Sequence, residues 1–394
     1  MNTGYSHPLA TRTPLRAPLA LALAAALGVA ALPGMAQAAT YTVTSAGDAG
    51  SGTCTATCTL RDAVAAATSG SDTVTFASTL SGDTITLDIA NKGHIAITHN
   101  LTIQGPGANL LTVSGGNVAT SANGGIFYTS GYALSISGIT LADGNTTGYG
   151  GALMAVSSPN VTLSQVALVN NHAKGGGGFY ERRGAFMVTH STISGNSAGS
   201  FGGGFCSQYG AVTLTDSTVA GNSAGSVGSG SGGGFYMRGA LLTVNSSTIS
   251  GNSSQAGSGF ELNAFSGSLT NSIVSANSNP LEQFLSTGQG QTTTLTVSYS
   301  LINGSYYVGN GATFSGSHLI TGQDPKLGTL AYNGGPTQTL ALLPGSPAID
   351  AGSNGTCETT DQRGVTRPDG KPGGSGTCDM GAFEVDTIFA NGFE

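Results

Sequence analysis

The sequence predicts an all-β fold, a parallel β-helix whose coils each contain three short strands and about 25 residues. The first observation behind this prediction is a repeated segment, which reads STISGN, STVAGN and STISGN at Ser191–Asn196, Ser217–Asn222 and Ser247–Asn252. The second is a GGGF-type element before each copy, which ends in Phe179, Phe205 and Phe235, with Leu153 and Phe260 in weaker copies. The third is short apolar alternation without helical spacing.

Each repeat contains three short alternating segments separated by Gly, Ser and Asn. Around Phe205 these segments are Gly204–Ser207, Ala211–Thr215 and Thr218–Ala220. Three strands per turn, with equivalent residues stacked about 4.8 Å apart, give a parallel β-helix with inward columns of like side chains. In the second strand the predicted column is Ile136, Leu163, Val188, Leu214, Val244 and Leu269.

One asparagine closes each repeat. The series is Asn145, Asn171, Asn196, Asn222, Asn252 and Asn277. Asparagines repeated at one corner of a solenoid stack their amides and stabilise the turn, and this interpretation is favoured over a ligand-binding role. The many Ser and Thr residues of the strands are expected to form exposed β surface.

The first 38 residues read as a signal peptide. Arg12 and Arg16 precede an apolar run, Leu19–Leu32, and a small-residue cleavage site, Ala36–Ala38. No second apolar stretch is long enough to span a bilayer, so no transmembrane segment is expected. The protein is therefore predicted to be secreted, passing through a periplasm to the cell surface or beyond it.

The rest of the chain divides into an N-terminal cap (39–72), the β-helix (73–323), a C-terminal cap (324–385) and a tail (386–394). Thr59 followed by Asp62 starts a short helix with a capping box, and this helix is expected to cover the first coil. The solenoid is expected to start with strands Thr73–Phe76, Thr84–Leu87 and Leu101–Ile103. The C-terminal cap is irregular and is expected to cover the last coil.

The cysteines fall into two pairs and one single residue. Cys54 and Cys58 precede the solenoid, Cys357 and Cys378 follow it, and each pair is expected to form a disulfide in an oxidising compartment. Zinc is the rival interpretation, but no histidines lie near either pair at ligand spacing. Cys206 is expected to be a free thiol.

Several motifs resemble those of exported bacterial proteins. Cys58–Val64, CTLRDAV, is similar to the CSLREA motif that names one such group. Asp324–Gly352 and Asp361–Glu384 resemble the choice-of-anchor Q region. The repeats also resemble those of chlamydial polymorphic outer-membrane adhesins. The resemblance implies a secreted or surface-associated, right-handed β-helix of the pectate-lyase-like superfamily, but it supplies no catalytic residues. Relatives often end in an anchoring segment, whereas this chain ends in DTIFANGFE, so the resemblance does not imply firm anchoring.

Charge is scarce, because only 8% of residues are charged, and its location is therefore informative. Between Gly93 and Gln323 the only basic residues are Lys174, Arg182, Arg183 and Arg238, all in or near the GGGF strand. If the phenylalanines point inward, the residues one and three places later point outward. The expected outward residues are Tyr180, Cys206, Tyr236, Glu261, Arg182, Gln208, Arg238 and Asn263.

Three functions fit this face. The first is binding of an extended polysaccharide or cell-surface glycan by an adhesin or matrix protein, through Lys174, Tyr180, Arg182, Gln208, Tyr236, Arg238, Glu261 and Asn263. The second is a polysaccharide lyase, in which Arg182 and Arg238 neutralise a uronate and Tyr180, Tyr236 or His190 supplies the base or acid. The third is a solvated face without a ligand. Whether the protein is an enzyme stays open.

Other functions are disfavoured. Asp143, Glu181, Asp216 and Glu261 are too scattered for a glycosidase pair or a calcium site. The histidines show no metal spacing, and the glycine run at Gly175–Gly178 lacks the lysine and helix of a phosphate loop. No cofactor is expected. A net charge of −7 with few basic residues disfavours nucleic acid as a partner.

Overall fold

The computed structural model describes residues 38–121, 123–225, 230–263, 266–278, 293–309, 312–368 and 376–385, together with the backbone of strand 284–287. The expected signal peptide, apart from Ala38, and the tail 386–394 lie outside the described residues. Residues from Ala38 onward belong to one compact unit. None of the described helices combines the length and the apolar character needed to cross a membrane.

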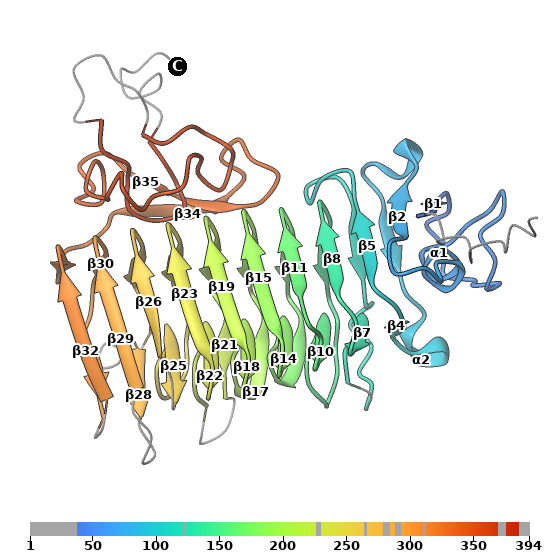
Figure 1. Ribbon diagram of the computed structural model, residues 1–394, viewed down its shortest axis with the longest axis horizontal. Helices are drawn as coiled ribbons and strands as arrows, with labels where there is room; N and C mark the ends of the chain where they lie inside the picture. Colours follow the sequence, from blue (N-terminus) through green and yellow to red (C-terminus); the bar gives the residue numbers. More distant parts are fainter. Residues whose placement is uncertain are drawn as a thin grey trace, which may run out of the picture. The chain divides into compact units, whose positions relative to one another are not determined.

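Three long parallel sheets confirm the predicted β-helix (Figure 1). Sheet A contains β1 (Thr40–Val43), β2 (Thr73–Phe76), β5 (Leu101–Gln104), β8 (Leu134–Ser137), β11 (Val161–Ser164), β15 (Ala185–Thr189), β19 (Ala211–Thr215), β23 (Leu241–Asn245), β26 (Ser266–Thr270), β29 (Thr293–Ser298) and β32 (Ala312–Ser317). Sheet B contains β3 (Thr84–Thr86), β6 (Thr112–Ser114), β9 (Thr140–Ala142), β12 (Ala167–Val169), β16 (Thr192–Ser194), β20 (Thr218–Ala220), β24 (Thr248–Ser250), β27 (Ile273–Ser275), β30 (Leu301–Ile302) and β33 (Ile320–Thr321).

Sheet C holds the GGGF strands. It contains β4 (Ile95–Ile97), β7 (Phe127–Ser130), β10 (Leu153–Val156), β14 (Phe179–Arg182), β18 (Phe205–Gln208), β22 (Phe235–Arg238), β25 (Phe260–Asn263), β28 (Phe284–Thr287) and β31 (Tyr307–Val308). A small fourth sheet lies in the turns between sheets B and C and contains β13 (His172–Gly175), β17 (Ser197–Phe201) and β21 (Ser223–Ala224).

The inward columns are in the predicted register. In sheet C, Phe205 pairs with Phe179 on one side and with Phe235 on the other. Their rings stack in parallel, with centroids 4.7 and 4.5 Å apart. In sheet A, Leu214 pairs with Val188 and Val244, as the spacing predicts. These columns are fully buried and form one core along the coils.

The asparagine ladder is confirmed for five of the six residues. From Asn196 onward, each side-chain oxygen accepts two hydrogen bonds from the asparagine of the preceding coil, as Asn222 Oδ1 does from the backbone and side-chain nitrogens of Asn196. The ladder runs through Asn171, Asn196, Asn222, Asn252 and Asn277. Asn145 is the exception, because Gly144 occupies the ladder position and Asn145 contacts Asn117 instead.

The threonines of the STIS segments correct one expectation. Thr192, Thr218 and Thr248 point out of sheet B, yet each is at most 1% exposed. Residues from the C-terminal part of the chain cover them. The Thr192 hydroxyl donates to the carbonyl of Gln338, and the Thr218 hydroxyl donates to Gln362 Oε1. These threonines are therefore an internal contact surface and not exposed β surface.

The N-terminal end is covered as predicted. Helix α1 (Leu60–Ala66) begins at Thr59 with a capping box to Asp62 and buries Leu60 and Val64 against the first strands. The Cys54–Cys58 disulfide precedes this helix. A short helix α2 (Ile89–Lys92) and the 3₁₀ turn η1 (Ser78–Leu80) lie in the following coil. Sheet A starts with β1, inside the segment that was expected to be only a cap.

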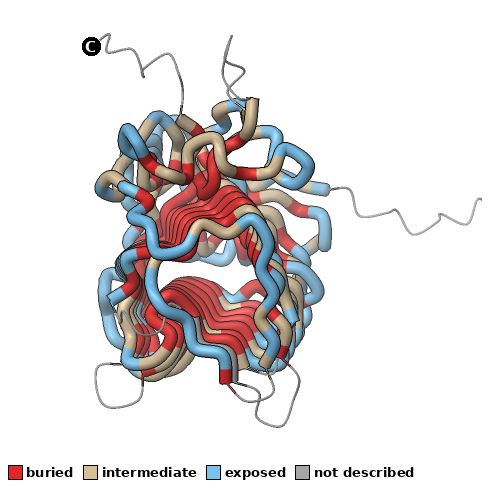
Figure 2. The backbone as a smooth tube through the Cα atoms, turned by 90° about the vertical axis from the view of Figure 1, so that its left-hand side faces the viewer, coloured by how far each residue is buried: buried red, intermediate tan, exposed pale blue. Residues whose placement is uncertain are grey.

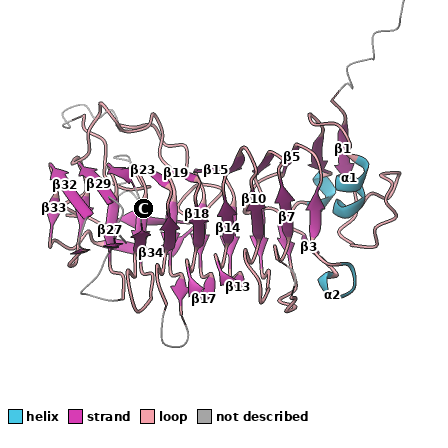
Figure 3. Ribbon diagram, turned by 60° about the horizontal axis from the view of Figure 1, so that its bottom comes forward, coloured by secondary structure: helices cyan, strands magenta, loops and turns pink. Residues whose placement is uncertain are grey.

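The C-terminal part differs from its expected position. Residues 324–368 and 376–385, which we term the lateral cap, contain the antiparallel hairpin β34 (Leu327–Ala331) and β35 (Thr339–Leu342) and the Cys357–Cys378 disulfide. The lateral cap lies along the side of several coils and not over the end of the last one (Figure 3). The cause is the threonine column, which supplies hydrogen-bond partners along that side.

Candidate functional site

The predicted outward residues of sheet C share two columns, as expected. Tyr180, Cys206, Tyr236 and Glu261 pair in one column, and Arg182, Gln208, Arg238 and Asn263 pair in the other. We call these eight residues the sheet C strip. Successive strands are about 4.8 Å apart, so Arg182 and Arg238 lie roughly 10 Å from each other with Gln208 between them.

The first column of the strip is covered, which corrects the expectation that it is exposed. Tyr180 is 4% exposed, and Cys206 and Glu261 are also buried. Tyr149 and Phe201, from the turns that precede sheet C, pack over this column. Their ring centroids lie 4.7 Å from Tyr180 and 5.3 Å from Tyr236, respectively. Only Tyr236 remains half-exposed in this column.

A glycine makes this cover possible. Tyr149, Gly175 and Phe201 occupy equivalent positions in three successive coils. A Cβ atom at Gly175 would lie 2.6 Å from the ring of Phe201, so any side chain there would displace the ring. Lys174, next to this glycine, is exposed and places its Nζ atom 5.9 Å from the centroid of the Tyr149 ring.

Burial changes the acidity of the covered groups. It raises the pKa of Tyr180 above its usual value and raises the pKa of Tyr236 to about 12. It also raises the pKa of the Cys206 thiol well above its usual value. All three groups stay protonated at neutral pH, so none of them is ready to accept a proton.

The second column continues into an exposed cluster at the corner between sheets C and A. We call this cluster, formed by Arg182, Arg183, Gln208, Tyr209 and Arg238, the arginine corner. Its three arginines are exposed, and Tyr209 is 49% exposed. Arg183 and Tyr209 adopt positive φ angles of 63° and 62° as the backbone turns the corner. The equivalent residue in the next coil is Gly239, and a Cβ there would lie 2.8 Å from the Tyr209 ring.

Acidic side chains of the same coils are withdrawn from the surface. Glu181 points into the core, Asp216 lies beneath the lateral cap and Glu261 is buried. Asp143 is half-buried. In the described part of residues 94–323 the exposed charges are therefore all positive, although the chain as a whole is acidic. The arginine corner is a local positive patch that favours an anionic ligand.

Glu181 and His190 do not belong to this patch. The carboxylate of Glu181 accepts a 2.5 Å hydrogen bond from the Ser207 hydroxyl inside the coil, and burial raises its pKa to about 7. His190 lies in the turn between β15 and β16, at the corner between sheets A and B, where its Nε2 atom is 3.4 Å from the Thr360 hydroxyl. His190 is thus separated from Tyr180 and Tyr236, the other residues predicted to supply the base or acid of a lyase.

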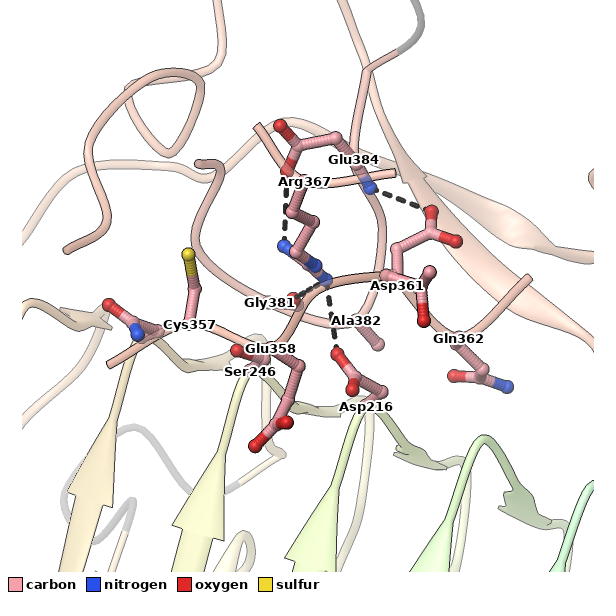
Figure 4. Close-up of polar contacts among 12 residues, drawn as sticks. Asp216, Ser246, Cys357, Glu358, Asp361, Gln362, Arg367, Gly381, Ala382 and Glu384 are labelled. Atoms are coloured by element: carbon pink, nitrogen blue, oxygen red, sulfur yellow. Dashed lines mark hydrogen bonds and ion pairs between the residues drawn. The ribbon is translucent and has the colours of Figure 1, made fainter. Parts of the chain in front are cut away.

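A second polar cluster fastens the lateral cap to the coils and was not predicted (Figure 4). The buried guanidinium of Arg367 lies 3.5 Å from Asp216 in the β-helix and 3.1 Å from Glu384 in the cap. It also donates to the carbonyls of Asp379 and Gly381. Buried charges of this kind require such pairing, so the cluster is structural.

The cluster makes stability depend on pH. Burial raises the pKa of Asp216 to about 8, helped by nearby Glu358, Asp361 and Glu384 and opposed by Arg367. His190 also faces Asp216, with Nε2 3.9 Å from Oδ2. The folded protein keeps this proton up to about pH 8, whereas the unfolded chain loses it near the ordinary aspartate pKa of 3.8. The free energy of unfolding is therefore expected to fall as pH rises from about 4 to about 8.

Asp216→Asn tests this dependence. Asparagine does not titrate, so the free energy of unfolding of the variant should fall less over that pH range. Urea denaturation at several pH values measures this change. Asp324→Asn, at an exposed position, is the matched control and should follow the parent protein. Equal slopes for Asp216→Asn and the parent would contradict the assignment.

A groove of about 420 Å³ lies elsewhere, between sheet B and the β34–β35 hairpin. Its walls include Ser194, Ala220 and Ser250 of sheet B and Leu330, Gln338 and Leu340 of the hairpin. It contains none of the predicted site residues. Among the described residues, no three His, Cys, Asp or Glu side chains are placed to hold a metal ion.

Sequence reasoning missed three aromatic residues of the site. Tyr149 and Phe201 lie in turns, outside the repeated strands, and the equivalent residues in the coils next to Phe201, Gly175 and Ser231, are not aromatic. Tyr209 lies one residue beyond the strand, where alternation no longer predicts direction. The position of Tyr209 beside Arg183 and Arg238 in the repeat was the one available signal.

Comparison with known proteins gives fold-level similarity. The sequence matches no protein-family model. It also matches no curated protein sequence. Among solved structures, the chain is similar to pectate lyase Pel9A, with 14% sequence identity and a TM-score of 0.47. The match covers 89% of this chain and 97% of that one. The strand pairing itself defines the fold as a parallel β-helix with three long sheets.

Proposed function

We propose that this protein is an exported β-helix protein of the adhesin or matrix type that binds an acidic polysaccharide at the arginine corner. The motifs similar to CSLREA and choice-of-anchor Q proteins, and the leader-like first 38 residues, support export to the cell surface or beyond it. The chemistry of the arginine corner supports the ligand class. A guanidinium group can donate two parallel hydrogen bonds to one carboxylate, and aromatic rings stack on sugar faces.

One observation carries the proposal. Three exposed arginines and the exposed Tyr209 lie at the same corner of three successive coils, while the acidic side chains of those coils are buried. The half-exposed Tyr149, Phe201 and Tyr236, with Lys174, extend this surface across sheet C. An elongated surface of this kind fits an extended chain carrying carboxylates better than a small molecule.

Binding is favoured over β-elimination. A lyase needs a base beside the carboxylate-neutralising arginines. Burial raises the pKa of Tyr180 and Tyr236, and His190 lies at another corner of the coil. Arg182 and Arg238 therefore remain as ligand-binding groups, because the tyrosines beside them stay protonated and His190 is remote from them.

The test is a calorimetric titration of the purified protein with polygalacturonate and, separately, with alginate. Arg182→Ala combined with Arg238→Ala should weaken binding at least about tenfold, because each charge-assisted hydrogen bond is worth roughly 1.5–3 kcal/mol and less at exposed positions. Added salt should weaken binding by the parent protein as well.

The controls separate this site from general charge effects. Lys326→Ala removes one exposed positive charge from the lateral cap and should leave affinity unchanged. Neutral dextran of similar length should bind weakly or not at all. Equal affinity of the parent and the double variant would contradict the proposal, and an unsaturated product absorbing in the ultraviolet would show a lyase instead.

A further inference from the structure

The two ends of the β-helix are finished differently. At the N-terminal end, helix α1 packs against β1, β2 and β4 and buries Leu60, Ala63 and Val64. At the other end, the outermost strands are β31, β32 and β33 of sheets C, A and B. Figure 2 looks onto this end and shows the lateral cap beside the last coil and not across it. Among the described residues, no helix covers this end.

The last coil presents strand edges. β32 pairs with β29, β31 with β28 and β33 with β30, each on one side only within the described residues. In a parallel ladder, half of the backbone N–H and C=O groups of an edge strand point away from its neighbour. Those groups of the three edge strands face out of the end of the coil, where they can pair with another strand.

Apolar side chains lie at the same end. Tyr307 is 49% exposed, Tyr306 and Val308 are also exposed, and Phe314 and Leu319 are only partly buried. Edge strands that avoid association usually carry lysine, proline or inward charges. β31, β32 and β33 contain no charged residue and no proline. Within the described residues, the longest edge strand, β32, therefore lacks the charges and prolines that prevent edge-to-edge pairing.

We infer that a second copy of this chain docks on the last coil, so that two β-helices join end to end. The end is complementary to itself. A two-fold axis across the coil axis places β32 antiparallel to β32 of the copy, and it then places β33 against β31. Those two strands are equal in length, with two residues each. Because α1 covers the opposite end, the assembly closes as a dimer and cannot extend into a filament.

The experiment measures the oligomeric state of the purified protein by sedimentation velocity over a range of concentrations. We expect a dimer that dissociates on dilution. Thr313→Lys combined with Ser315→Lys sets positive charges of the two copies against each other and should give a monomer. Ser135→Lys combined with Ser137→Lys adds the same charges to the same face of the interior strand β8, and this matched variant should remain a dimer.

A crosslink provides a second measurement that does not depend on destabilising variants. Ser315→Cys lies near the middle of β32 and should form an intermolecular disulfide under mild oxidation, whereas Thr162→Cys in β11 should not. A parent protein that stays monomeric at every concentration would overturn the inference. Dimers that form only after removal of residues 386–394 would also overturn it, because the tail of the same chain would then occupy this end.

Discussion

Replacing Asn222 by alanine is expected to lower the free energy of unfolding by about 3–6 kcal/mol, because the change breaks the buried ladder in the middle. Asn222 Oδ1 accepts hydrogen bonds from the backbone and side-chain nitrogens of Asn196, so two buried donors lose their acceptor. Its side-chain nitrogen donates to the carbonyl of Ile193 and to Asn252. Each buried polar group left unpaired costs about 1–3 kcal/mol.

Chemical denaturation measures this loss, and Asn145→Ala is its matched control. Asn145 ends a repeat in the sequence but lies outside the ladder, so its replacement should cost less than about 1 kcal/mol. A domain is typically stable by only about 5–15 kcal/mol, so Asn222→Ala is expected to remove a large share of that total. Similar losses for the two variants would show that the ladder contributes little beyond local turn formation.

Arg367→Met is expected to lower the free energy of unfolding by about 3–5 kcal/mol and to loosen the lateral cap. Methionine keeps much of the apolar volume but removes the charge that pairs with buried Glu384 and lies beside buried, protonated Asp216. The carbonyls of Asp379 and Gly381 lose a donor at the same time. A buried charge without its partner is far more costly than the intact pair is stabilising.

Hydrogen exchange locates this effect. Amides of β34 and β35 should lose protection in Arg367→Met, while amides of β18 and β19 in the core of the β-helix should lose less. Arg183→Ala, which removes an exposed arginine at the arginine corner, should change stability by no more than about 0.5 kcal/mol. Unchanged protection of the hairpin would show that apolar contacts around Leu342 and Met380 hold the cap without Arg367.

The repeated parts of the fold were predictable from the sequence because one coil determines the next. Aligning neighbouring repeats with one another, and letting side chains alternate along each strand, predicts the phenylalanine column, the Leu214 column and the asparagine ladder. The helix after Thr59 was predictable from its capping box. Both disulfides were predictable from cysteine positions outside the solenoid.

Contacts between different parts of the chain were not predictable in this way. Alternation places Tyr180 on the outer side of sheet C, but it says nothing about Tyr149, which folds over it from another turn. The burial of Thr218 depends on Gln362, and the two residues are 144 positions apart. The pairing of Asp216 with Arg367 has the same origin. A periodic pattern predicts which way a side chain points within a coil. Whether that side chain is buried depends on segments that lie outside the repeats.

The lateral cap also limits how this gene can evolve. Neighbouring repeats that are nearly identical favour unequal recombination, and a solenoid whose coils contact only their neighbours tolerates an added or lost coil. Here the cap meets an ordered series of equivalent positions in five consecutive coils: Thr192, Thr218, Thr248, Ile273 and Leu301. Gln338, Gln362 and Ala382 of the cap form hydrogen bonds with the three threonines, in that order. Apolar residues of the cap pack against the two aliphatic residues. A change in repeat copy number within this section would place the wrong residue under each contact. The contacts of the cap therefore require a fixed number of coils in this section.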